Sequence, residues 1–289
     1  MEFPKGELGF GKYIADHMLE VRWSMETGWG KPHIVPSHDF AVHPFNSAFH
    51  YAFEGFEGMK AYRDANGKIR TFRPEMNAKR LVRTGQEICF PSFEPEEFVK
   101  CVDELLRIDE KWVPEAPSSL YLRPTIVSMT NKLGVHPPHE TMLFVASSPS
   151  GPYFKSGLKP VKLKVEGTGV RAWPGGTGHV KAGANYTMGI KYVKSALDAG
   201  YDQVIWLNGK NITEAGACNI FVYWINKNNE KELVTPMLDG TILPGITRDS
   251  VLQMGKEDKR FITCEKKISV TDLVKAHKEK RVNFCLTRS

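Results

Sequence analysis

Cysteines are few in this sequence, and their arrangement excludes several classes of protein. The 289 residues contain five cysteines, an odd number, and no Cys-x-x-Cys pair. Scattered thiols argue against a disulfide framework or a structural zinc site and favour a reducing compartment. No apolar run approaches the length of a membrane span, and the N-terminus has neither a signal core nor an Arg/Ser-rich transit pattern. We therefore expect a cytoplasmic protein, or a mitochondrial one if a targeting segment is missing from the sequence.

Several fingerprints of known chemistry are also missing. GxSxG, Walker and GxGxxG motifs do not occur. His136 and His139 are separated by two prolines and have no obvious third ligand, so no metal site is expected. The net charge of +6 comes from basic residues that alternate with acidic ones. Without a basic arm or an RNA-binding aromatic pattern, nucleic acid is not an expected partner, whereas a small anionic ligand is compatible with the charge.

The hydrophobic pattern predicts a mixed α/β chain. Asn66-Gly67 predicts a hairpin turn, because this pair supplies the positive φ angles that such turns need. Pro74 and Pro95 each occupy a favourable first position of a helix. Apolar spacing predicts strands over 58–62, 69–73, 120–127, 142–146, 160–165, 203–207, 212–214, 219–225 and 232–235. A helix is expected to follow the glycine-rich stretch that ends at Gly183 and to run to Gly200, another to follow Leu243 to Arg248, and a third to begin at Ser269 or Thr271.

A stretch rich in Ser, Pro and Gly over 147–152 is the best candidate for a linker. The expected organisation is a small N-terminal α/β domain over 1–148, an interdomain linker over 149–159 and a C-terminal domain over 160–289.

Lys181 follows a glycine-rich stretch and precedes Gly183. Glycines allow close approach of the backbone to a ligand, and a lysine presented in this way can form a Schiff base. The alternative is a solvated lysine in a flexible loop. Glu214 lies on a predicted strand between apolar strands, where a carboxylate suits a pyridine nitrogen, although a surface Glu on an edge strand fits the same pattern.

Two further features suit an anionic ligand. The segment 243–248 (LPGITR) places Gly245 before a helix, so the N–H groups of Ile246 and Thr247 could bind a phosphate; a plain loop-to-helix junction is the alternative. Arginines beside apolar or aromatic residues usually have an anionic partner, which is either a ligand or a structural carboxylate. The arginines of this kind are Arg80, Arg123 and Arg171.

Each of these signals is weak alone, but together they occur in the order found in a known family. The segments are 51–62 (YAFEGFEGMKAY), 72–74 (FRP), 121–124 (YLRP), 152–154 (PYF), 171–173 (RAW), 181–186 (KAGANY), 213–221 (TEAGACNIF) and 243–248 (LPGITR). Over nearly the whole chain the sequence resembles the branched-chain amino-acid aminotransferases, which are enzymes of fold type IV that use pyridoxal 5′-phosphate (PLP).

The resemblance implies a fold, an activity and a partner. The fold is a two-domain α/β (α+β mixed) structure, with a small N-terminal α/β domain and a larger PLP-binding domain of pseudobarrel form. The activity is transfer of the amino group from Leu, Ile or Val to 2-oxoglutarate. The family acts as homodimers.

The resemblance also implies roles for individual residues. Lys181 matches the lysine that forms the Schiff base and moves a proton between Cα and C4′. Tyr186 matches the partner of the cofactor's phenolic oxygen, and Glu214 matches the partner of the pyridine nitrogen. Arg80, Ile246 and Thr247 match phosphate contacts, with Arg171 near them. The side-chain pocket for the substrate matches Phe10, Tyr51, Phe56, Tyr121, Arg123 and Tyr153.

Two departures from the family are visible. Residues 283–289 (NFCLTRS) do not resemble the family's continuation, which supplies a threonine for the phosphate, a Thr-Ala backbone for the substrate carboxylate and, in animal members, a Cys-x-x-Cys pair. We therefore expect a C-terminally incomplete chain that binds PLP weakly and turns over poorly. Ala217 replaces a threonine common in animal relatives. The alternatives are a non-catalytic truncated isoform, an incomplete gene model, a D-amino-acid aminotransferase and an aminodeoxychorismate lyase; the pocket aromatics argue against the last two.

Overall fold

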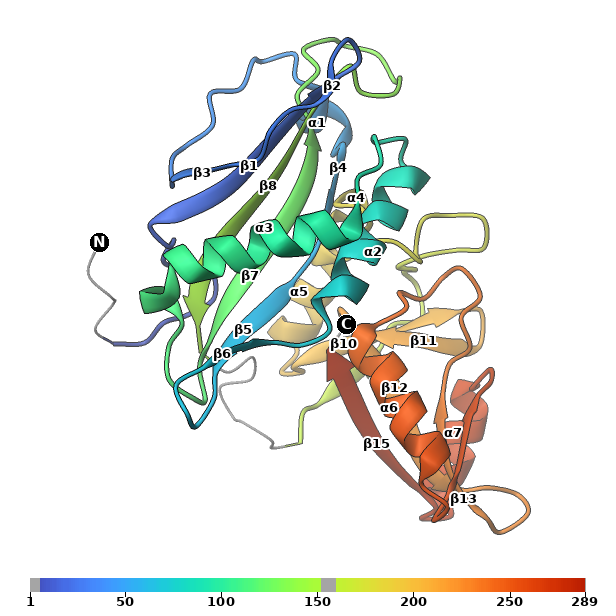
Figure 1. The fold of residues 1–289 in the computed structure, drawn as a ribbon. Helices are drawn as coiled ribbons and strands as arrows, with labels where there is room; N and C mark the ends of the chain where they lie inside the picture. The colour runs from blue at the N-terminus through green and yellow to red at the C-terminus, as the bar shows by residue number, and fades with distance from the viewer. Residues whose placement is uncertain (1–5, 152–159, 289) are drawn as a thin grey trace. The chain divides into compact units, whose positions relative to one another are not determined.

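The structure is a computed structural model that describes residues 6–151 and 160–288, and side chains as far as residue 282. It divides into two compact units (Figure 1). The N-terminal unit consists of Met1–Lys159 together with Lys181–Ala184, and the C-terminal unit consists of Pro160–Val180 and Asn185–Ser289. In the described ranges, no helix combines the length and the apolar character that a membrane crossing requires.

The N-terminal unit is built on an antiparallel sheet of eight strands. Its order is β2-β1-β8-β7-β5-β6, with β3 paired to β1 and β4 paired to β7. The strands are β1 (His17–Ser24), β2 (Gly28–Trp29), β3 (His33–Pro36), β4 (Glu54–Phe56), β5 (Met59–Arg63), β6 (Ile69–Thr71), β7 (Ser119–Ser128) and β8 (Glu140–Ser150). The predicted hairpin is confirmed, since β5 and β6 pair with Ala61 opposite Thr71.

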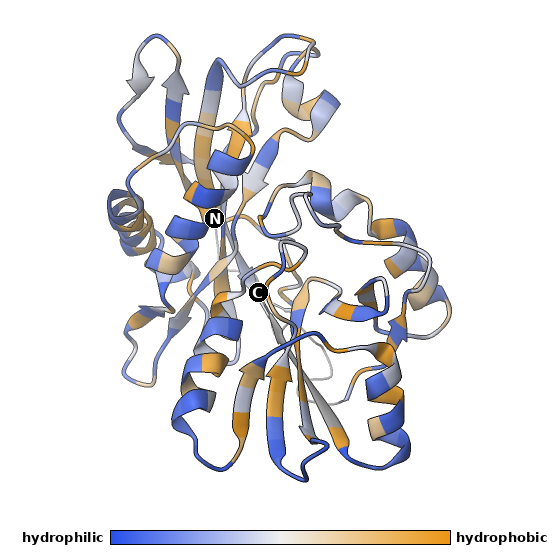
Figure 2. Ribbon diagram, turned by 90° about the vertical axis from the view of Figure 1, so that its right-hand side faces the viewer, coloured by the Kyte–Doolittle hydropathy of each residue, from blue (hydrophilic) through white to orange (hydrophobic). Residues whose placement is uncertain are grey.

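Two amphipathic helices pack against the sheet and contribute to the core of this unit. α2 (Pro74–Glu87) and α3 (Pro95–Ile108) both begin with proline, as the sequence predicts, because the first turn of a helix does not need that N–H group. A shorter helix, α1 (Ser47–Tyr51), and a 3₁₀ turn, η1 (Glu110–Trp112), complete the helical part. Helices in Figure 2 carry hydrophobic and hydrophilic residues side by side, which fits burial of one stripe only.

The two faces of β7 have different partners. Side chains alternate along a strand, so Leu120, Leu122 and Ile126 share one face, and all three are fully buried in the hydrophobic core with α2 and α3. Tyr121 and Arg123 must then point to the opposite face. This alternation separates a packed core from a face that is available for chemistry.

The linker predicted over 147–152 is wrong for its first four residues. Ser147–Ser150 extend β8, with Ser147 opposite Leu122 and Pro149 opposite Leu120. The register between β1 and β8 ends at Val145, so Pro149 lies where β8 has no paired strand on that side. Proline is tolerated at such an edge because its missing N–H group is not needed there. The stretch 152–159 lies outside the described residues.

The C-terminal unit contains a sheet of seven strands in the order β14-β13-β12-β11-β10-β9, with β15 paired to β12. The strands are β9 (Leu163–Val165), β10 (Gln203–Asn208), β11 (Asn211–Ala215), β12 (Cys218–Ile225), β13 (Lys231–Thr235), β14 (Ile262–Glu265) and β15 (Val282–Arg288). β10 to β13 are antiparallel, as predicted, whereas β9 and β14 join in parallel. Its core joins Ile205, Ile220, Val222 and Val234 to residues of α7.

The helix predicted between Gly183 and Gly200 is divided into two. α4 (Ala184–Thr187) and α5 (Ile190–Asp198) are separated at Met188 and Gly189. Gly200 follows the C-cap with φ +81°, which is the left-handed conformation that glycine adopts without strain. α6 (Ile246–Glu257) and α7 (Val270–Lys278) are the other helices, and Ser269 caps α7 by accepting from the N–H group of Asp272, as the sequence predicts.

We expect Leu105→Ala to lower the free energy of unfolding by about 2–5 kcal/mol, because the change leaves a cavity in a close-packed core. Leu105 is 1% exposed among the core side chains of α3. Leu133→Ala is the matched control, since Leu133 is 55% exposed. Urea denaturation followed by circular dichroism measures both. Equal losses for the two variants would contradict the packing described above.

Candidate functional site

The candidate residues fall into two groups, one in each unit. Arg80, Phe56, Tyr121, Arg123 and Lys181 belong to the N-terminal unit, with Phe10 and Tyr51. Arg171, Tyr186, Glu214, Ile246 and Thr247 belong to the C-terminal unit. Tyr153 lies outside the described residues.

Lys181 is fixed by pairing of its own backbone with β4. The N–H group of Phe56 donates to the carbonyl of Lys181 at 3.0 Å, and the N–H group of Gly183 donates to the carbonyl of Glu54 at 3.1 Å. These bonds place Ala182 opposite Gly55 in an antiparallel bridge. The Lys181 N–H group also donates to Thr84 Oγ1 at 3.1 Å. Lys181 is 6% exposed, so it is not a solvated lysine in a flexible loop.

The pairing decides where the Lys181 side chain points. Residues opposite each other in an antiparallel pair project to the same face, so Lys181 shares the face of Phe56, whereas Ala182 shares that of Gly55. The Lys181 amine lies 5.0 Å from the centroid of the Phe56 ring. A buried lysine whose amine lies beside an aromatic ring is less hydrated than a surface lysine, which is the environment that Schiff-base chemistry requires.

The face that Lys181 shares with Phe56, called the lysine face below, is lined by aromatic rings and one guanidinium group. The Arg123 guanidinium lies 4.7 Å from the Phe56 ring centroid and 5.3 Å from that of Tyr121. Arg123 Nη2 donates to the Tyr121 hydroxyl at 3.1 Å, and the ring of Phe10 meets Tyr121 edge to face at 4.9 Å. The result is an apolar wall with one cation, which suits a ligand that is partly aliphatic and partly anionic.

Gly58 makes room for the Tyr121 side chain. A Cβ atom built at residue 58 would lie 2.1 Å from the Tyr121 hydroxyl, a distance that no real pair of atoms adopts. Glycine is therefore required at this position if Tyr121 is to keep its place beside Arg123.

Glu57 was not predicted as a functional residue, yet it forms the most buried ion pair of this unit. Arg80 Nε and Nη2 donate to its two carboxylate oxygens at 2.6 and 2.9 Å, and Asn77 donates at 2.8 Å. Burial alone would raise the pKa of Glu57, but the charge and hydrogen bonds of Arg80, the charge of Lys181 and the Asn77 bond hold it below its usual value. In the sequence, only its position in the 51–62 segment pointed to a functional role for Glu57. Its partners can be identified only from the fold.

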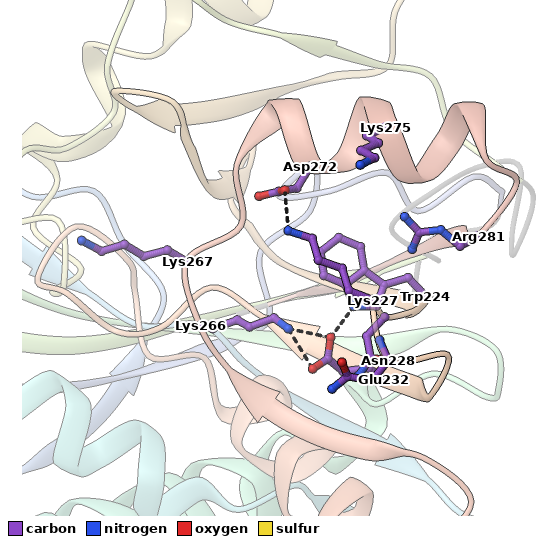
Figure 3. A pocket seen from close by; sticks show the side chains of 10 residues that line it. Trp224, Lys227, Asn228, Glu232, Lys266, Lys267, Asp272, Lys275 and Arg281 are labelled. Carbon is purple, nitrogen blue, oxygen red and sulfur yellow. Dashed lines mark hydrogen bonds and ion pairs between the residues drawn. The ribbon is translucent and has the colours of Figure 1, made fainter.

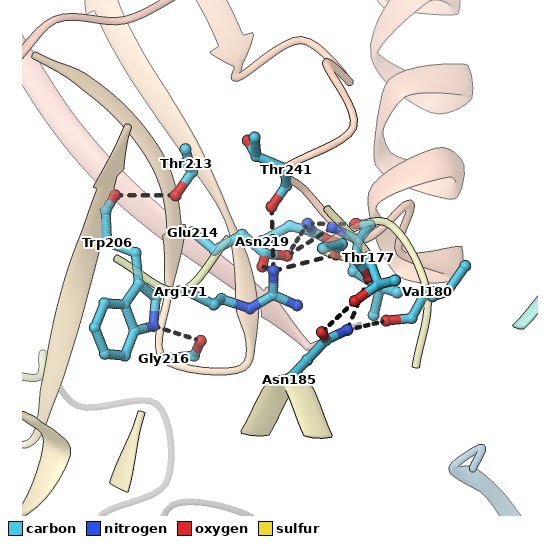
Figure 4. A network of polar contacts seen from close by, with 12 residues as sticks. Arg171, Thr177, Val180, Asn185, Trp206, Thr213, Glu214, Gly216, Asn219 and Thr241 are labelled. Atoms are coloured by element: carbon cyan, nitrogen blue, oxygen red, sulfur yellow. Dashed lines mark hydrogen bonds and ion pairs between the residues drawn. The ribbon is translucent and has the colours of Figure 1, made fainter. Parts of the chain in front are cut away.

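Glu214 occupies a comparable position in the C-terminal unit (Figure 4). It is 1% exposed at the end of β11, and its Oε1 accepts from Asn219 Nδ2 at 3.1 Å and from the Leu243 N–H group at 3.2 Å. Arg171 Nη1 lies 2.9 Å from Glu214 Oε2 and donates to the Gly178 and Thr241 carbonyls. These partners hold the carboxylate in one orientation. The alternative of a surface Glu on an edge strand is therefore wrong.

The glycine-rich stretch before Lys181 is held by side chains. Asn185 Nδ2 donates to the carbonyls of Thr177 and Val180 at 2.8 and 3.0 Å, and the Thr177 hydroxyl donates to Asn185 Oδ1 at 2.7 Å (Figure 4). These bonds fix the backbone that leads to Lys181. The sequence predicts no separate role for Asn185, which lies within the segment 181–186, because its partners cannot be identified from the sequence.

The other residues predicted for this unit lie around a cavity and a helix end. Tyr186 and Arg171 line a cavity of about 370 Å³ together with Trp206 and apolar residues of α5. Ile246 and Thr247 open α6, whose N-cap, Gly245, provides no side-chain hydrogen bond. The N-terminus of a helix that lacks a side-chain cap attracts anions.

Tyr51 has a backbone partner in the N-terminal unit. It lies at the end of α1, and its hydroxyl accepts from the Gly134 N–H group at 3.1 Å. Its role in the side-chain pocket stays a prediction.

A second basic cavity of about 400 Å³ lies in the C-terminal unit, between the β12–β13 hairpin and α7 (Figure 3). Three of its cations have partners. Lys266 pairs with Glu232 at 2.6 Å, Lys227 lies 4.0 Å from Asp272, and Arg281 pairs with Glu279. Lys275 also lines the cavity, whereas Lys267 points away from these groups in Figure 3.

A family model described as amino-transferase class IV matches residues 54–278 of the chain. The branched-chain-amino-acid aminotransferase of Dictyostelium discoideum is 47% identical over 280 residues, which cover 96% of this chain and 74% of the relative.

Solved structures show the same fold. The branched-chain amino acid aminotransferase of Escherichia coli superposes with a TM-score of 0.74 at 26% identity, covering 90% of this chain and 80% of that one. The branched-chain amino acid aminotransferase of Thermobaculum terrenum, in its PLP form, gives a TM-score of 0.73 at 23% identity, covering 90% of this chain and 79% of that one.

We expect Glu57→Gln to lower the free energy of unfolding at neutral pH by about 3–5 kcal/mol, because Arg80 keeps a buried charge without its carboxylate. The folded pKa of Glu57 is below the ordinary 4.5, so its stabilising effect is complete above that value and is lost as the pH falls through the lower folded pKa. The variant should therefore show a flatter pH dependence of stability between about pH 5 and pH 3.

Glu110→Gln provides the control for this variant. Glu110 pairs with Arg63, but its side chain is 60% exposed, so its loss should cost less than about 1 kcal/mol. Urea denaturation over a pH series compares the two variants. If both lose the same stability, the Glu57–Arg80 pair does not hold this unit together.

Proposed function

Since the chain belongs to the class IV aminotransferases and, within them, to the branched-chain-amino-acid aminotransferases, we propose that it transfers the amino group of leucine, isoleucine or valine to 2-oxoglutarate, with PLP as cofactor. The observation that carries this proposal is the position of Lys181. Its buried amine lies on the same face of β4 as Phe56, in the unit that also presents Tyr121 and Arg123.

The buried polar groups of the chain fit PLP. Glu214 is an oriented carboxylate with three polar partners, which is what a protonated pyridine nitrogen requires. The Thermobaculum terrenum relative, which has the same fold, carries PLP. When bound, PLP supplies an electron sink for the charge that develops at the substrate Cα.

Each residue then has a defined task. Lys181 would hold the cofactor through its amine and would carry the proton that leaves the substrate Cα. Glu214 would keep the ring nitrogen protonated, and Tyr186 would donate to the phenolic oxygen. Arg171, which the resemblance placed near the phosphate, pairs here with Glu214, so we assign it the task of orienting that carboxylate.

The phosphate contacts proposed for this chain are Arg80 and the N–H groups of Ile246 and Thr247. The lack of a side-chain cap at the start of α6 supports the second pair. Arg80 donates to both oxygens of Glu57, so its contact with the phosphate is supported by the resemblance alone.

The substrate side chain is proposed to lie against Phe10, Phe56 and Tyr121, with Tyr51 and Tyr153 completing the pocket. Aromatic carbon suits the branched aliphatic side chains, because apolar contact is favourable without hydrogen bonds. Arg123 is the cation for the distal carboxylate of glutamate or 2-oxoglutarate. The homodimer implied by the family is part of the same proposal.

We expect Lys181→Ala to abolish both the visible absorbance of the lysine–PLP Schiff base and transamination between leucine and 2-oxoglutarate. Borohydride reduction of the parent chain, followed by peptide mapping, should place the pyridoxyl group on Lys181. Lys191→Ala and Lys194→Ala are the controls, because both lysines are exposed on α5. A pyridoxyl group on either of them would contradict the assignment.

We expect Glu214→Gln to leave the fold intact and to reduce kcat by at least about a hundredfold, because an amide cannot keep the ring nitrogen protonated. Stopped-flow absorbance with leucine as the only substrate measures this step. Glu230→Gln, an exposed position in the β12–β13 hairpin, should turn over like the parent. Turnover of Glu214→Gln within a few-fold of the parent would reduce Glu214 to a structural carboxylate.

A further inference from the structure

A carboxylate that the proposed function does not use lies on the strand face that carries Lys181. Along β4 the side chains alternate, so Glu54 and Phe56 share one face, whereas a Cβ on Gly55 would meet Thr84 and Ile126 of the core. The register places Glu54 opposite Val127 and Phe56 opposite Thr125. Glu54 therefore projects to the face that carries Lys181.

Gly183 provides the space that the Glu54 carboxylate fills. A Cβ built at residue 183 would lie 2.1 Å from Glu54 Oε1 and 2.9 Å from its Cγ. Since the Gly183 N–H group donates to the Glu54 carbonyl, the two residues are direct cross-strand neighbours. Lys181 and Gly183 lie two residues apart and belong to the same face. The Glu54 carboxylate, opposite Gly183, therefore occupies the next position on that face after Lys181.

The nearby cation has spare hydrogen-bonding capacity. Arg123 uses Nη2 for the Tyr121 hydroxyl, but its Nε is buried and has no acceptor among the described residues. A buried guanidinium donor without a partner is costly, which points to an anionic group that arrives with a ligand. Arg123 also lies over the ring of Phe56, which shares the lysine face with Glu54.

Glu54 and Arg123 influence each other. Burial raises the pKa of Glu54, and the charge of Arg123 opposes that rise. Glu54 is half-buried, so the field between the two groups is screened less than on an open surface. Both side chains project to the same face of the sheet, so the charge of Arg123 acts on the Glu54 carboxylate through space.

We propose that Glu54 is a specificity-determining residue that balances the charge of Arg123, and so sets how strongly glutamate is favoured over leucine. This inference rests on the proposed function, because it concerns the two kinds of substrate that such an enzyme must accept. If Arg123 had no carboxylate nearby, binding of a branched aliphatic side chain would be weakened, because that side chain leaves the buried charge without a partner. An arginine locked to a carboxylate would disfavour the distal carboxylate of glutamate.

Glu54 resolves this conflict by position. With an aliphatic side chain bound, the Glu54 carboxylate compensates Arg123 through space. With an acidic side chain bound, Nε and the remaining guanidinium donors turn to the distal carboxylate, which then competes with Glu54 for the same charge. Glu54 thus weakens glutamate binding and supports leucine binding, and acts as a positioning residue rather than a catalytic one.

Glu54→Gln tests this role because the amide keeps the shape and removes the charge. The rate of each half-reaction, glutamate or leucine alone with the PLP-loaded chain, is followed by absorbance. The ratio of kcat/KM for glutamate to that for leucine should rise by about tenfold, mostly through the two KM values. Because both rates come from the same preparation, incomplete cofactor loading cancels in the ratio.

Glu54→Asp and Asp103→Asn complete the design. Glu54→Asp keeps the charge, and its ratio should stay within about threefold of the parent, so it also tests the account if Glu54→Gln does not fold. Asp103 is an exposed carboxylate on α3, the helix that packs on the opposite face of the sheet, and its removal should leave the ratio unchanged.

The outcomes separate the two proposals. An unchanged ratio in active Glu54→Gln, or an equal loss for both substrates, overturns the role of Glu54 and leaves the proposed function intact. A tenfold change in Glu54→Asp as well would show that shape, not charge, matters, which also overturns it. A parent chain that binds PLP but uses neither substrate overturns the proposed function itself.

Discussion

Two backbone hydrogen bonds between β4 and the segment from Lys181 to Gly183 determine where the Lys181 amine lies. A strand pairing allows only two directions for each side chain, so a shift of one residue would turn Lys181 into the core and Ala182 toward the ligand face. The short strand β4 has this effect because its other edge is held by β7, which belongs to the sheet of the N-terminal unit. The position of the Lys181 amine is thus set by the register of a three-residue strand.

Buried ion pairs supply the second constraint. Arg80 with Glu57 and Arg171 with Glu214 are nearly excluded from solvent, and each carboxylate has further donors. Such pairs add little net stability compared with apolar packing, but they hold a charged group in one orientation. Charges that are oriented before a ligand binds need no rearrangement during a reaction, which is the role that the proposed function gives to Glu214.

Short sequence motifs predicted the elements whose geometry depends on neighbouring residues. The Asn66-Gly67 turn, the proline-led helices and the Ser269 cap were read correctly because turn geometry and capping involve neighbouring residues. β4 was not predicted, since three residues with a central glycine have no periodicity of their own. Ser147–Ser150 were misread because their Ser and Pro content hides a strand that only β7 stabilises. The resemblance to the family assigned Phe56, Tyr121 and Arg123 to one side-chain pocket. The partners of Glu57 and Glu214 can be identified only from the fold.

Transfer of nitrogen from one substrate to the other tests the central claim most directly. The PLP-loaded chain is mixed with ¹⁵N-leucine and 2-oxoglutarate, and glutamate is analysed by mass spectrometry. The account predicts ¹⁵N-glutamate with the parent chain and none with Lys181→Arg, in which a cation remains but no Schiff base forms. ¹⁵N-glutamate from Lys181→Arg at the rate of the parent, or none from a PLP-loaded parent, would contradict it.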